Sequence, residues 1–154
     1  MPHFRDDEMR LDAAEADLLR GLAAEMQDLL RAEVHEDDPV MLRLFPDAYD
    51  SPEDADSFRE MVGDELRKQK LDGLDKVRAT LGPKGAAVIS LDPESSSAWL
   101  TTLADMRLSI GTRLGVTEET MAQDVSAEAP EDSAMLVLHW LGWLQESMLE
   151  AMIR

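Results

Sequence analysis

The densest group of potential metal ligands is His35-Glu36-Asp37-Asp38, which brings one imidazole and three carboxylates together. Divalent cations accept such ligands. A histidine-based metal site on a helix also needs a second ligand at helical spacing, and no second histidine follows at that distance. An acidic helix end before Pro39 is more often a solvated loop. We therefore expect no metal site and no bound cofactor.

Two further segments contain residue types used in catalysis or phosphate binding. Ser95-Ser96-Ser97 has no His or acid at a spacing typical of nucleophilic catalysis, and Gly82-Pro83-Lys84-Gly85 lacks the length and the Ser or Thr of a phosphate-binding loop. Both segments fit helix caps and turns better. The chain has no cysteine, which excludes thiolate metal sites and Cys nucleophiles. No catalytic residue is predicted, and an enzyme of unrecognised type ranks third among the functional hypotheses.

Residues 110–124 have the pattern of a helix-turn-helix. Ile110 to Met121 supplies the turn glycine and the apolar positions that follow it. The recognition helix would run from Glu118 to Glu128, and it contains four acids and no Lys or Arg, so DNA phosphates would repel it. The alternative is a helix that ends at Gly115, followed by an N-cap at Thr117. Direct DNA binding through this segment is therefore the second hypothesis.

A group of basic residues interrupts an otherwise acidic chain, which has 15 Lys+Arg, 33 Asp+Glu and a net charge of −18. That net charge disfavours nucleic acid and anionic membranes as partners. Between Arg67 and Lys84, however, basic residues outnumber acids. They suit docking to an acidic surface of a partner protein or to a second copy of the chain, whereas the alternative is charge balancing without a ligand. The predicted partner-binding residues, called the basic strip below, are Arg67, Lys68, Lys70, Lys76 and Arg78.

The N-terminal part of the chain predicts two helices. Asp12 and Glu15 form a capping box at the start of the first, and apolar side chains recur at helical spacing from Leu18 to Leu30. Asp38 then caps a short apolar helix over residues 40–45.

Two longer helices should follow, each opened by a cap residue and a proline. Ser51 precedes Pro52 at the start of a helix that should end at Gly82, with a kink or break near Gly73. Asp92-Pro93 opens another helix. Methionines lie on the apolar stripes of these helices, which predicts core filling, and an adaptable binding groove is the alternative.

The remaining segments predict one more helix and a minor β ribbon. Residues 133–154 carry apolar side chains on all sides of their first half, so we expect this helix in the middle of the bundle, with Leu136, Trp140 and Trp143 in the core. Residues 86–91 have a β-like pattern and can pair with residues 9–11. The predicted fold class is mainly all-α: a single domain over residues 1–154, a multi-helix bundle with a minor two-stranded β ribbon.

The N-terminal residues lack the basic flank and apolar run of a secretory signal. The longest apolar stretch, residues 134–144, is far shorter than the roughly 20 residues that a bilayer-spanning helix needs. We therefore expect a cytoplasmic protein that does not bind membranes.

Four sequence blocks occur in a distinctive order: Leu44–Tyr49 (LFPDAY), Trp99–Leu108 (WLTTLADMRL), Gly111–Val116 (GTRLGV) and Trp140–Glu146 (WLGWLQE). Together they resemble an uncharacterised actinobacterial family of domains of unknown function. The resemblance implies a mostly helical cytoplasmic protein, with no established enzymatic activity and a link to thiol-based oxidative-stress regulation of transcription. No residue here can take the thiol role. The leading hypothesis is a non-enzymatic cytoplasmic regulator that acts through protein–protein interaction in transcription or stress response.

Overall fold

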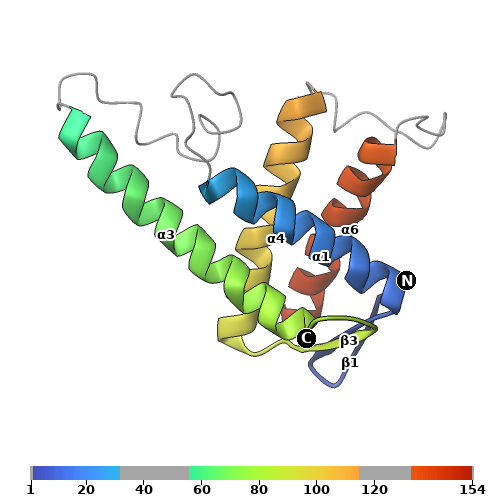
Figure 1. Cartoon of the computed structure of the whole chain (residues 1–154). Coiled ribbons are helices and arrows are strands. Elements are labelled where there is room, and N and C mark those ends of the chain that lie inside the picture. The colour runs from blue at the N-terminus through green and yellow to red at the C-terminus, as the bar shows by residue number, and fades with distance from the viewer. Residues whose placement is uncertain (1, 32–55, 115–132, 154) are drawn as a thin grey trace.

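The structure, a computed structural model, describes residues 2–31, 56–114 and 133–153. Within these ranges it contains four helices and one three-stranded antiparallel sheet (Figure 1), so the predicted fold class, mainly α with minor β, is confirmed. Several predicted features lie outside the described residues: the acidic group 35–38, the short helix 40–45, the helix start at Ser51-Pro52, and residues 115–128, which include the recognition helix of the helix-turn-helix pattern. The elements are β1 (His3–Arg5), β2 (Glu8–Leu11), α1 (Ala13–Arg31), α3 (Asp56–Leu81), β3 (Ala87–Ser90), α4 (Pro93–Leu114) and α6 (Ser133–Ile153).

Two helices begin at the caps that the sequence predicts. At α1, the Asp12 backbone N–H donates to Oε1 of Glu15 at 2.9 Å, and the Glu15 N–H donates to Oδ1 of Asp12 at 2.8 Å, which is a complete capping box. At α4, the Ser95 N–H donates to Oδ1 of Asp92 at 2.8 Å. This hydrogen bond stabilises the carboxylate and lowers the pKa of Asp92 below its usual value.

Helix α3 continues past Gly73 as one helix and ends where the glycine-rich turn begins. Gly82 has a φ of 72° and Gly85 a φ of 81°, a conformation that glycine adopts without steric cost. Arg20 of α1 binds this turn: its Nε donates to the Gly82 carbonyl at 2.9 Å, and its Nη2 donates at 2.7 Å to the carbonyls of both Leu81 and Gly85. One guanidinium therefore binds the last carbonyl of α3 and two carbonyls of the turn that follows, and it links this end of α3 to α1.

The sheet contains one strand more than the sequence predicts. β2 pairs with β3 in the expected antiparallel ribbon, with Met9 opposite Ile89, and both side chains are fully buried. The additional strand is β1, which joins β2 through a tight turn at Asp6 and Asp7. Both turn residues have positive φ, 52° and 60°, as a two-residue hairpin turn requires.

Helix α4 occupies the centre of the bundle, where it packs against α3, α6 and α1. Trp99 of α4 is fully buried, and its indole N–H donates to Oγ1 of Thr80 on α3 at 2.9 Å. None of the helices in the described ranges combines the length and the apolar character needed to cross a membrane.

Helix α6 packs mainly on α4 and lies at the side of the bundle (Figure 1), so its predicted central position is wrong. Leu136 is 54% exposed and Trp143 is 38% exposed, which contradicts their predicted place in the core. Trp140 is half-buried against the core. The reason is geometric: with one main neighbour, α6 buries only the side formed by Leu138, Leu141, Leu144 and Met148.

Candidate functional site

Two members of the basic strip line a groove between α3 and α4. The groove has a volume of about 520 Å³ and is open to solvent, a size that suits a small molecule. Lys70 and Lys76 lie in its wall together with the acids Asp72 and Glu94. Because cations and carboxylates alternate there, the groove does not select strongly for either charge.

Lys70 of the strip forms an ion pair at the contact between α3 and α4. Its Nζ lies 2.8 Å from Oδ1 and 3.0 Å from Oδ2 of Asp105. Asp105 is only 7% exposed, and the side chain of Lys70 is 15% exposed. Burial raises the pKa of Asp105, although the hydrogen bond and the charge of Lys70 act in the opposite direction. Lys70 is thus part of the helix packing rather than a freely projecting cation.

Two other members of the strip pair with acids nearer the surface. Lys76 Nζ lies 2.9 Å from Oε1 of Glu94, across the same groove, and this hydrogen bond raises the pKa of Lys76. Arg67 Nη1 lies 3.9 Å from Oδ1 of Asp64, one turn earlier on α3. The local acids therefore offset these two positive charges.

The last two members differ from each other. Arg78 donates from Nη1 to Oε1 of Gln27, and Nε2 of Gln27 donates to Oδ1 of Asp75 at 2.8 Å, so these side chains link α3 to α1. Lys68 is exposed and forms no ion pair with any residue in the described ranges. Four of the five strip residues thus have polar partners within the chain, which is the arrangement that charge balancing without a ligand would produce.

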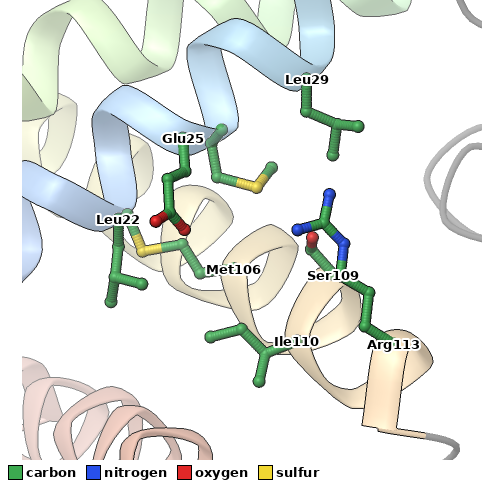
Figure 2. A pocket seen from close by; sticks show the side chains of 8 residues that line it. Leu22, Glu25, Leu29, Met106, Ser109, Ile110 and Arg113 are labelled. Atoms are coloured by element: carbon green, nitrogen blue, oxygen red, sulfur yellow. The ribbon is translucent and has the colours of Figure 1, made fainter. Parts of the chain in front are cut away.

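A second hollow lies between α1 and α4 (Figure 2), but it is too small for a cofactor. It has a volume of about 30 Å³, space for one or two water molecules. Met26 and Met106 line its floor and are almost completely buried, as core filling predicts. Glu25 and Arg113 lie on opposite sides of its opening. The described side chains include no group of three His, Cys, Asp or Glu residues arranged to hold a metal ion.

The outer side of α6 is the surface that sequence reasoning missed. Leu136, Trp140 and Trp143 follow one another at spacings of four and three residues, so they align along one side of the helix. These three residues are called the α6 stripe below. A helix that is apolar all round is normally buried, and this rule placed the stripe in the core. The sequence shows that α6 has apolar side chains on all sides, but only the position of the neighbouring helix decides which side is buried.

Acidic residues flank the α6 stripe. Glu146 and Glu150 are exposed and lie three and seven residues after Trp143, on the same flank of the helix. Residues 133–153 contain no Lys or Arg. The stripe therefore combines exposed aromatic and aliphatic surface with negative charge, which suits recognition of a macromolecule more than catalysis.

The comparisons with known proteins give a family. A family model described as Domain of unknown function (DUF2017) matches residues 3–152. Neither the curated proteins nor the solved structures include a match to the chain. The predicted resemblance to a family of domains of unknown function is therefore confirmed, and since the match covers almost the whole sequence, the chain belongs to the DUF2017 family.

Proposed function

We propose that this protein is a non-enzymatic regulator that acts by binding another protein, and that the α6 stripe is its docking surface. The observation that carries the proposal is the exposure of Leu136 and Trp143 on a helix that contacts mainly one neighbour. Exposed Trp and Leu side chains lose apolar contact with water when a partner covers them, and Trp is enriched among residues that dominate binding energy.

The basic strip is the other surface considered for docking. Lys70, Lys76 and Arg67 already have acidic partners in the same chain, so a partner protein would have to displace those contacts or add to them. Within the described residues, neither Glu146 nor Glu150 beside the α6 stripe forms an ion pair, so no intramolecular ion pair has to be displaced there. For this reason α6, and not α3, carries the docking surface in the function proposed here.

The family resemblance set out above supports a place in cytoplasmic regulation of transcription or of a stress response. The absence of cysteine means that any signal reaches this chain through its partner or through a group other than a thiol. A second copy of the chain is an alternative partner, and the experiment below separates it from a different protein.

The test is affinity capture from cytoplasmic extract with four immobilised baits, followed by binding assays with the purified captured protein. The baits are the wild type, Leu136→Ser with Trp143→Ser, Lys68→Glu with Lys76→Glu, and the control Leu18→Ser, which changes an exposed leucine on α1. We expect a partner that all baits bind except the α6 double variant. Loss of binding only in the lysine variant would assign docking to the basic strip, and equal binding to all four baits would overturn the proposal.

A further inference from the structure

We infer that the partner covers the α6 stripe with a basic amphipathic helix, an inference that rests on the proposed function. Leu136, Trp140 and Trp143 lie on one side of α6, at spacings of four and three residues. The apolar seam of a second helix has the same spacing, so two helices can pack along this line with side chains interdigitating.

Charge decides which kind of helix fits. Glu146 and Glu150 lie beside Trp143, and residues 133–153 contain no Lys or Arg. Arg107 of α4 donates to Oε1 of Gln145 at 2.9 Å, and among the described residues it forms no ion pair with either glutamate. Lys or Arg residues bordering an apolar seam would meet these two carboxylates when the seam covers the stripe. The net charge of −18 adds a long-range attraction that speeds the encounter with a basic partner.

The same charges argue against a second copy of the chain. Antiparallel pairing of two α6 helices about Trp143 would bring together two molecules that each carry −18, with four exposed glutamates near the contact. Like charges across an interface cost binding free energy. An acidic helix from another protein would meet the same repulsion.

The experiment uses synthetic peptides of about 18 residues, or five helical turns. One is an amphipathic Leu/Lys helix, the second replaces every Lys with Glu, and the third has the Leu/Lys composition in an order without an apolar face. Binding of each labelled peptide to the full chain is measured by fluorescence anisotropy. The protein variants are Leu136→Ser with Trp143→Ser, Glu146→Gln with Glu150→Gln, and two controls on α1, Leu18→Ser and Asp28→Asn.

We expect only the amphipathic Leu/Lys peptide to bind. Its Kd should rise at least tenfold in the Leu136→Ser, Trp143→Ser variant. The glutamate variant should weaken binding several-fold at low salt, and that difference should shrink as salt screens the charges. Neither control should change the Kd. In a Trp140→Phe protein, bound peptide should shift the emission to the blue, because Trp143 is the exposed indole and Trp99 is already buried.

Several results would overturn the inference. The inference is wrong if the Leu/Glu peptide, or the Leu/Lys peptide without an apolar face, binds as tightly as the amphipathic Leu/Lys peptide. It is also wrong if the α6 variants leave the Kd unchanged. A dimer in sedimentation that the Leu136→Ser, Trp143→Ser variant dissociates would assign the stripe to a second copy. If Trp143 already emits in the blue without peptide, another part of the same chain covers the stripe. If a captured natural partner depends on the stripe while the Leu/Lys peptide fails to bind, the proposed function stands and the basic helix is wrong.

Discussion

The ammonium group of Lys70 donates to both carboxylate oxygens of Asp105, 2.8 Å from one and 3.0 Å from the other, at the contact of α3 with α4. Lys70, which the sequence predicts to be part of a partner-binding surface, therefore forms an ion pair within the chain. The pair matters because Asp105 is largely withdrawn from water. Removal of the lysine would leave a buried carboxylate without its counterion.

We expect Lys70→Met to lower the free energy of unfolding by about 3 kcal/mol, because breaking a buried ion pair from one side leaves an uncompensated charge. Lys68→Met, at an exposed position two residues earlier, should change it by less than about 0.5 kcal/mol. Urea denaturation of the two variants provides the measurement. Equal stability of both would mean that the pair does not hold α3 against α4.

Asp105 should contribute to the pH dependence of the free energy of unfolding. Its pKa is raised by burial, so the native state holds this proton at pH values where the unfolded state has lost it. The contribution of Asp105 to the free energy of unfolding therefore falls as pH rises from about 4, the ordinary pKa of Asp, through the raised native value. Asp105→Asn removes this component. As pH rises over that range, the free energy of unfolding of the wild type should therefore fall relative to that of Asp105→Asn. Parallel curves would show that the pKa of the Asp105 carboxyl is not raised.

Arg20 should be irreplaceable by lysine. Its guanidinium donates to the carbonyls of Leu81, Gly82 and Gly85, at the end of α3 and in the turn after it, and a lysine has neither the planar fork nor enough reach for all three. We expect Arg20→Lys to lower the free energy of unfolding by about 2 kcal/mol. Arg31→Lys, at the exposed end of α1, serves as the control and should have little effect. A small effect at both positions would show that solvent replaces the Arg20 bonds without cost.

The hairpin turn offers a stabilising change. Asp6 and Asp7 both have positive φ, which Asn and Gly adopt more readily than Asp. Asp6→Asn with Asp7→Gly should raise the free energy of unfolding by roughly 0.5 to 1 kcal/mol, measured as a higher Tm. Asp7→Ala removes the same charge but keeps a side chain with poor tolerance for positive φ. If Asp6→Asn with Asp7→Ala stabilises as much as Asp6→Asn with Asp7→Gly, charge repulsion and not backbone conformation limits the turn.

Local sequence signals predicted most of the fold correctly. The Asp12–Glu15 capping box and the Asp92 cap depend only on residues within one turn of each other, so their spacing in the sequence is sufficient to recognise them. The ribbon between residues 9–11 and 86–91 also followed from local pattern. β1 was missed because an alternation over only three residues is too short to indicate a strand, and its pairing depends on the unusual turn at Asp6 and Asp7.

The candidate site depends on relationships between distant residues, and there the sequence was less informative. Lys70 and Asp105 are 35 positions apart, and nothing in either local pattern indicates that they meet. Leu136 and Trp143 look like core residues because an apolar helix gives no indication of which side its neighbour covers. The packing of α6 chiefly on α4 exposes them.

The proposed function requires that the α6 stripe binds a partner protein and that the chain still folds when Leu136 and Trp143 are replaced. The most direct measurement is the Kd of the purified partner for the wild type and for the Leu136→Ser, Trp143→Ser variant, with the free energy of unfolding of each protein measured in the same buffer. We predict that the Kd rises at least tenfold, about 1.4 kcal/mol, while the variant remains folded, because neither Leu136 nor Trp143 belongs to the fully buried core. An unchanged Kd in a folded variant would contradict the claim.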